Sequence, residues 1–196
     1  MLTTCGYVDL SEYEHDFNAP DLTICGDIVL WCYAHDFNAP ELTTCGNVDL
    51  RGYKHKFNAS MLITCGDVFL RGYKHDFNSP ELTTCGSVDL RLYEHDFNVP
   101  KLTTCGNVYT NRDKTLIIGG KTYNTVSIDE FAMIDVKWKC KDGIEYSSAK
   151  YLSLPNPEKC FVAKVGKHIA HGETLAQAIG DAQFKALEYT DKSVIV

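Results

Sequence analysis

The chain has 196 residues, of which 44% are hydrophobic and 23% charged, and its formal net charge is −7. These values are typical of a globular protein, and no run of about eighteen apolar residues is present, which excludes a membrane-spanning helix. The charge is uneven: residues 1–110 hold fifteen Asp and Glu against seven Lys and Arg, whereas residues 111–196 hold eleven against twelve. An acidic first half disfavours nucleic acid as a partner.

A unit of twenty residues recurs without insertion from Met1 to about Tyr109. A fixed period of this length is typical of a solenoid, in which each coil buries its apolar side against its neighbours. A valine and a leucine alternate with polar residues in each copy, so we expect one short strand per coil and a parallel sheet with rungs about 4.8 Å apart. The near-constant residues, numbered in the third copy, are Leu42, Cys45, Gly46, Val48, Leu50, Tyr53, His55, Phe57 and Asn58.

The spacing C-x-x-V-x-L-x-x-Y-x-H superimposes on the pattern L-x-x-L-x-L-x-x-N-x-L, and F-x-x-P-x-L continues it. The repeat therefore resembles a leucine-rich repeat of the short bacterial type, with Cys, Tyr and His where Leu, Asn and Leu are usual. The resemblance implies a mainly β solenoid of about five and a half coils over residues 1–110. Because the usual asparagine is replaced, Asn58 and its equivalents are expected to form a different ladder, bonded to backbone groups in the turn after Phe57.

Six cysteines fall in register among apolar residues, so we expect them to be buried free thiols. With no basic and apolar leader visible, this pattern favours a reducing cytoplasm. The histidines, also in register, are expected to stack as a structural column that acid would loosen. Cys and His can ligate metals, but columns at strand spacing do not make a tetrahedral cage, so no metal or cofactor is expected. Gly46 is expected to permit a tight corner. The six cysteines are Cys5, Cys25, Cys45, Cys65, Cys85 and Cys105.

Residues between the constant valine and leucine, and just outside them, are expected to share the solvent face of the sheet. They vary between copies and include aromatic residues and arginines, the side chains that protein interfaces favour. Three arginines in one column are expected to repel each other, which favours a partner bearing carboxylates. The predicted partner-binding residues are Trp31, Arg51, Phe69, Arg71, Arg91 and Tyr109.

Residues 111–196 lack the period and predict a small α+β domain. Turn signals at Gly119-Gly120, Asp142-Gly143 and Gly166-Lys167 predict hairpins between the flanking apolar segments. The expected strands cover 115–118, 121–126, 131–139, 144–149, 160–165 and 168–170, with a further strand-like end at 194–196. Thr174 and Gln177 predict the capping box of a single helix.

Residues 160–175 resemble a small domain that follows repeats in uncharacterised phage and bacterial proteins, and that resemblance implies no activity. His168 and His171 form an H-x-x-H pattern, which two hairpin residues before a helix explain more simply than a metal site. An anion at His171-Gly172, before the helix, is an alternative.

The sequence favours a non-enzymatic recognition module that binds an unknown protein through the sheet face. The alternative is a phage-encoded inhibitor of a host defence or nucleic-acid enzyme, acting by binding or by acidic mimicry. An enzyme is disfavoured because no nucleophile elbow, phosphate loop or metal motif is present. The coil that begins at Leu2 has no capping residues before it, which also suggests a homodimer through the open solenoid end.

Overall fold

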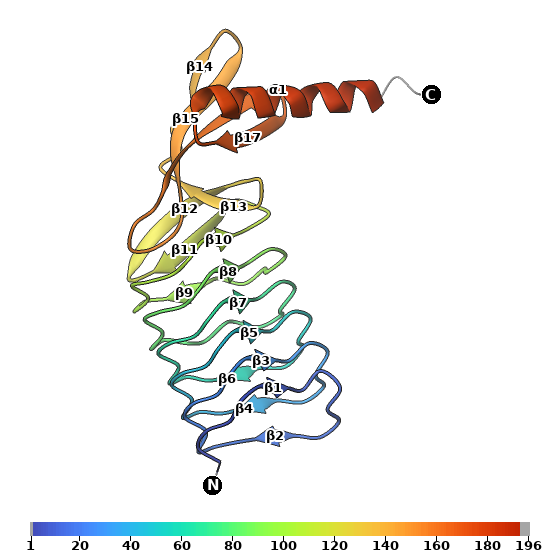
Figure 1. The fold of residues 1–196 in the computed structure, drawn as a ribbon, viewed down its shortest axis with the longest axis vertical. Helices are drawn as coiled ribbons and strands as arrows, with labels where there is room; N and C mark the ends of the chain where they lie inside the picture. The colour runs from blue at the N-terminus through green and yellow to red at the C-terminus, as the bar shows by residue number, and fades with distance from the viewer. Residues whose placement is uncertain (1, 193–196) are drawn as a thin grey trace.

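The computed structural model describes residues 2–192, with side chains to residue 188. A solenoid of stacked coils forms the first half, and strands and one helix continue from its last coil (Figure 1). The predicted mainly β fold with 20-residue coils is confirmed. No described helix is long and apolar enough to cross a membrane.

Each coil contributes one two-residue strand to a parallel sheet, in register at intervals of twenty residues. Val48, for example, lies between Ile28 and Val68, because every coil repeats the same buried valine or isoleucine. The predicted sheet is therefore confirmed. Its strands are β1 (Val8–Asp9), β3 (Ile28–Val29), β5 (Val48–Asp49), β7 (Val68–Phe69), β8 (Val88–Asp89) and β10 (Val108–Tyr109).

A second parallel sheet follows the Phe-Asn pairs and joins only the first three coils. It contains β2 (Phe17–Asn18), β4 (Phe37–Asn38) and β6 (Phe57–Asn58), while β9 (Asn98–Val99) pairs elsewhere. The amide of Asn38 donates to the side-chain oxygen of Asn18 at 2.9 Å, and Asn58 donates to Asn38 at 2.7 Å. The expected bonding of these asparagines to the backbone is corrected: they bond to one another.

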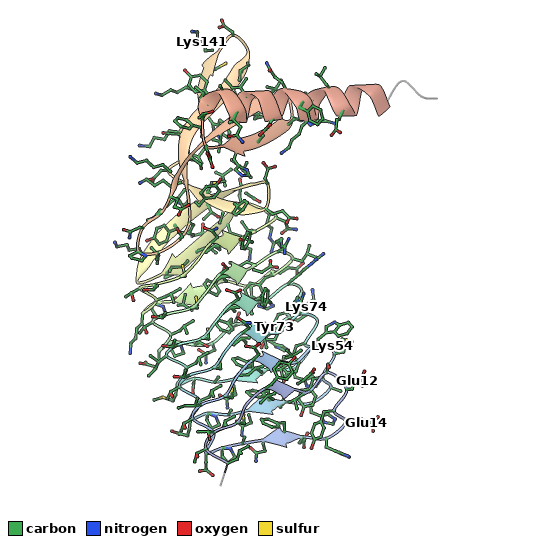
Figure 2. The ribbon with its side chains drawn as sticks, in the orientation of Figure 1. Glu12, Glu14, Lys54, Tyr73, Lys74 and Lys141 are labelled. Carbon is green, nitrogen blue, oxygen red and sulfur yellow. The ribbon has the colours of Figure 1, made fainter. Side chains whose placement is uncertain are left out.

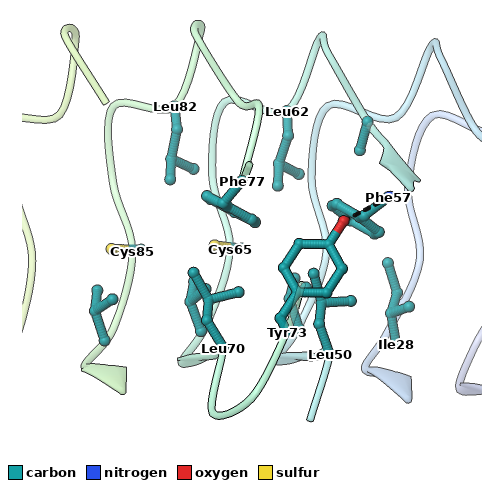
Figure 3. Packing of buried hydrophobic residues seen from close by; sticks show 14 of the residues in the cluster. Ile28, Leu50, Phe57, Leu62, Cys65, Leu70, Tyr73, Phe77, Leu82 and Cys85 are labelled. Carbon is teal, nitrogen blue, oxygen red and sulfur yellow. Dashed lines mark hydrogen bonds between the residues drawn. The ribbon is translucent and has the colours of Figure 1, made fainter. Parts of the chain in front are cut away.

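Tyrosine takes the role that the leucine-rich pattern gives to asparagine. The hydroxyl of Tyr53 accepts the N–H of Phe37 and donates to the carbonyl of His35, both at 2.8 Å. Tyr73 accepts the N–H of Phe57 at 3.0 Å in the same way (Figure 3). These hydroxyls tie each coil to the one before it, from inside the core, because the tyrosine rings are almost fully buried.

The cysteine column is buried as predicted, with Cys25 to Cys105 at most 6% exposed. Cys5, in the first coil, is half-buried. Burial raises the pKa of the Cys105 thiol to about 11. All nine cysteines are free thiols.

Gly46 is required for a different reason than the one predicted. Its backbone does not have a positive φ; a Cβ there would lie only 2.9 Å from the nitrogen of Asp27 in the preceding coil. The glycine column therefore permits close approach of neighbouring coils. The left-handed turn lies later, at Gly52 (φ 68°) and at the equivalent Leu92 (φ 58°).

The histidine column lies at an outer corner and contacts the preceding coil. His35 Nδ1 lies 3.0 Å from Asp16, and His95 Nδ1 lies 3.1 Å from Asp76. Where Lys56 replaces the aspartate, His75 bonds instead to a backbone carbonyl. A protonated ring would thus have a carboxylate beside it, which opposes the ring-to-ring repulsion expected in acid.

The remaining elements confirm the predicted hairpins. The strand expected over 131–139 was too long: it ends at Ile134, because Asp135 (φ 61°) turns the chain. Thr174 Oγ1 accepts the N–H of Gln177 at 3.2 Å and caps the helix, as predicted. The strand-like residues 194–196 lie outside the described residues. The elements are β11 (Lys114–Ile118), β12 (Lys121–Ile128), β13 (Phe131–Ile134), β14 (Lys139–Lys141), β15 (Ile144–Tyr151), β16 (Lys159–Val165), β17 (His168–Gly172) and α1 (Leu175–Lys192).

Residues 111–192, hereafter the cap, complete the last coil of the solenoid. β13 pairs antiparallel with β10, and β11 pairs parallel with β9. Leu154 exchanges two backbone hydrogen bonds with Cys105, where the next coil would otherwise bond. Leu116, Ile118 and Leu152 belong to the solenoid core. The repeats end at about residue 110, but the sheet and the core continue across that point.

Candidate partner-binding face

The predicted binding residues occupy the outward face of the main sheet and the turn beside it. Phe69 lies in β7 and Tyr109 in β10, and both are half-buried. Trp31, Arg51, Arg71 and Arg91 each lie in the turn two residues after the outward position of their strand. Trp31 is 59% exposed and lies against the turn glycine of the next coil, Gly52.

Two of the three arginines have a carboxylate partner in their own coil. The guanidinium of Arg51 binds the nearly buried carboxylate of Asp49, with Nε 2.9 Å from Oδ1. Arg91 binds Asp89 in the same way and also reaches Glu130 of the cap. The hydrogen bonds to Asp89 raise the pKa of Arg91. The expectation of three mutually repelling cations is therefore wrong.

The fourth coil departs from this pairing. Phe69 replaces the aspartate, and Arg71 is exposed with no carboxylate within 4.0 Å among residues 2–188. Arg51 extends toward this coil, with its Cζ 5.4 Å from the centroid of the Phe69 ring. Phe69 thus has a guanidinium stacked on the side that faces the third coil.

One group expected on the solvent face has a structural role instead. The side-chain oxygen of Asp27 accepts the N–H of Asn47, Asn47 accepts from Asp67, and Asp67 accepts from Ser87, each at 2.7 Å. This column links successive coils. A signal for it was present in the sequence, because only Asp, Asn and Ser, all hydrogen-bond acceptors, occur here after the first coil.

An aromatic column extends the face into the cap, and the sequence did not predict it. Ring centroids lie 5.0 Å apart between Tyr109 and Phe131, and again 5.0 Å apart between Phe131 and Tyr151. His171 packs edge-on against the last two rings at 5.4 and 5.6 Å. These contacts depend on the antiparallel pairing of β10 with β13, for which residues 128–134 carry no sequence signal.

Two hollows flank this column. The first, of about 300 Å³, we call the junction hollow; it is lined by Phe69, Tyr109 and Phe131 together with Asp89, Arg91, Asp129 and Glu130. The second, of about 380 Å³, we call the helix hollow; it is lined by Asp129, Tyr151, His171, Glu173, Asp181 and Lys185.

Asp129 connects the two hollows and acts as a clamp. Its carboxylate accepts from His171 Nδ1 at 2.8 Å and from Lys185 on the helix. Burial alone would raise the pKa of Asp129, but the hydrogen bonds and charges of these two partners outweigh it and lower the pKa. Through these two contacts Asp129 joins the sheet, which carries His171, to the helix, which carries Lys185.

A larger hollow, of about 940 Å³, lies on the other side of the solenoid, at the corner that carries the Phe-Asn pairs. Ring centroids there widen from 5.3 Å between Phe37 and Phe57 to 6.1 Å between Phe57 and Phe77. The backbone bond that Ala39 makes to Asn58 has no counterpart at Ala59. The hollow is therefore the place where the second sheet opens.

The described residues contain no group of three metal-ligating side chains close enough to hold an ion. No protein-family model, curated protein or solved structure matches the chain.

Proposed function

We propose that the chain is a non-enzymatic recognition module that binds a partner protein through the outward face of its main sheet. The observation that carries the proposal is the combination of exposed Trp31 with an aromatic-lined hollow on the same face. The binding residues would be Trp31, Arg51, Phe69, Arg71, Arg91 and Tyr109, joined by Phe131 and Glu130 of the cap.

The rigidity of this face supports the proposal. Arg51 and Arg91 are held by aspartates that also accept the backbone N–H of the same arginine, at 3.1 and 3.0 Å. Side chains fixed before binding lose less conformational freedom on association, which favours affinity. The repeats supply a scaffold whose interior hardly changes while its face varies from coil to coil.

The test places a photo-crosslinking residue at position 31 or 71 of the full chain, in the cells that produce it. A matched probe at Lys74 samples the outer edge of the coil that carries Arg71, away from the sheet (Figure 2). The proposal expects a defined crosslinked protein from positions 31 and 71 but none from 74. Crosslinks that form only at position 74 would contradict it.

The proposal also covers the source of the protein and the cellular compartment in which it works. The resemblance to leucine-rich repeats and to domains of phage and bacterial proteins supports a bacterial or phage source. Nine free thiols support a reducing compartment such as the cytoplasm. The exposed apolar side chains of the first coil, Leu2 and Tyr7, support a homodimer as an additional form. Measurement of molar mass by light scattering across a concentration series would test it.

A second candidate is inhibition of a nucleic-acid enzyme by acidic mimicry. It is favoured by the exposed aspartates Asp16, Asp36 and Asp76, which are 85%, 76% and 80% exposed along the histidine corner. Lys56 interrupts this column. Inhibition of a nuclease by the wild-type chain, lost when Asp36 and Asp76 are changed to Asn, would favour this function over the first.

A further inference from the structure

We infer that the segment recognised by the sheet face is basic, and that an arginine side chain of the partner enters the junction hollow. This inference rests on the proposed function and specifies the chemistry of its partner. It reverses the sign expected from three arginines on one face.

The charges around the hollow favour a positively charged partner segment. Asp89, Asp129 and Glu130 line it. Arg91 pairs with Asp89 and reaches Glu130, and Lys185 binds Asp129 from the helix, so three carboxylates face two cations and one negative charge is in excess. In the adjoining helix hollow, the carboxylates of Glu173 and Asp181 are exposed and form no ion pair with a described residue. A carboxylate entering here would meet like charges, whereas a guanidinium would be attracted at short range.

The aromatic walls favour a planar cation. Phe69 and Tyr109 lie on rungs that have β8 between them, so their backbones are about 10 Å apart. A guanidinium can stack on aromatic rings and donate to carboxylates at the same time. Phe69 already stacks Arg51 on the side of the third coil, while the hollow opens on its other side.

The arginines of the face do not oppose this sign. Arg51 and Arg91 carry their own carboxylate partners, so each behaves with its partner as a neutral pair. Arg71 alone lacks such a partner among residues 2–188. Its charge should weaken the binding of a basic segment, and removing that charge should strengthen it.

The test measures fluorescence anisotropy of three labelled glycine-serine peptides with the full chain. One peptide carries three arginines, one carries citrulline at the same places, and one carries glutamate. The inference expects the arginine peptide to bind about tenfold more tightly than the citrulline peptide, because citrulline keeps the shape but not the charge. Equal binding of these two peptides, or preference for glutamate, would overturn the inference.

Three substitutions locate the binding. Phe69→Val removes a wall of the hollow and is compatible with the fold, because Val29 occupies the equivalent position. Phe69→Val and Glu130→Gln should each weaken arginine-peptide binding at least threefold, and Arg71→Glu should strengthen it. Glu14→Gln removes one negative charge on the turn of the first coil and is the matched control (Figure 2). If Glu14→Gln weakens binding as much as Glu130→Gln, the attraction is unspecific and the inference is wrong.

The two proposals can fail separately. If position 31 or 71 crosslinks a partner through an acidic segment, the sheet face binds and the basic-partner inference fails. If neither position crosslinks while position 74 does, the proposed function itself fails.

Discussion

The repeat half, residues 2–110, and the cap use hydrogen bonds in different ways. In the repeats one side chain does the same task in each coil, as Tyr53 and Tyr93 do for the backbone of the preceding coil. In the cap the contacts do not repeat at a fixed interval: Leu154 bonds to Cys105, and Asp129 binds Lys185 of the helix. Comparison of copies can therefore identify roles in the first region but not in the second.

Positions where one copy differs from the others also identify roles, because a changed residue changes the contact made at that position. Lys56 stands where other coils have an aspartate, and His75 therefore bonds to the backbone carbonyl of Lys54 instead of to a carboxylate. Phe69 stands at the strand position that Asp49 and Asp89 occupy in their coils, so Arg71 has no carboxylate partner among the described residues. The face that we propose for binding is formed largely where the copies differ, while the columns that hold the coils together are formed where they agree.

Removal of the cap is expected to have the largest effect on the repeat half. Deleting residues 111–196 would expose the apolar end of the last coil, including Leu102 and Val108, which are now at most 1% exposed. We expect the fragment to aggregate, because terminal coils need a cap. Size-exclusion chromatography and circular dichroism measure the outcome. A monomeric fragment with an intact sheet signal would show that the repeats are stable alone.

The tyrosine column can be broken at one coil. Tyr53→Phe removes a hydroxyl that pairs a buried N–H and a carbonyl, and should lower the free energy of unfolding by about 1–3 kcal/mol. Tyr13→Phe is the matched control. Tyr13 is 46% exposed and its hydroxyl makes no hydrogen bond to residues 2–188, so a change below about 0.5 kcal/mol is expected. Urea unfolding of both variants decides; equal losses would contradict a role in linking coils.

Restoring the repeat residue at position 79 should stabilise the folded state. Ser79 replaces the alanine of the first three coils, and its buried hydroxyl has no hydrogen-bond partner among the described residues. Ser79→Ala should raise the free energy of unfolding by about 1 kcal/mol. The reverse change, Ala59→Ser, should lower it by a similar amount. A loss of stability in Ser79→Ala on thermal or urea unfolding would show that the hydroxyl has a function there.

The smallest expected effect concerns the clamp in the cap. Because the pKa of Asp129 is lowered in the folded state, its contribution to stability is present above its ordinary value of 3.8 and is lost as the pH falls through the folded value. The melting temperature of wild type should therefore exceed that of Asp129→Asn at pH 7, and the difference should shrink as the pH falls below 3.8. Parallel melting curves across this range would contradict the clamp.

The solenoid was predictable because its evidence is repeated. The period placed Val48 and Leu50 in the core and the cysteines beside them. The role of Tyr53 was not predictable, because a hydroxyl that reaches the preceding coil depends on the distance between stacked coils. The exposure of the residues on the proposed face was predictable but their charge pairing was not, since the sequence shows Arg51 and Asp49 without showing that they pair. Phe131 was missed because its neighbours come from three distant strands.

The uniform coil also fixes a length. The hydrogen bonds of the main sheet and of the buried tyrosines recur at twenty residues, so removing or adding one whole unit would leave each of these bonds with an equivalent partner. Such a change would move Trp31 by one rung, about 4.8 Å, relative to the cap. The distance between the two ends of the proposed face is thus set by counting units, and a chain of this design could be matched to longer or shorter partners without redesign of its interior.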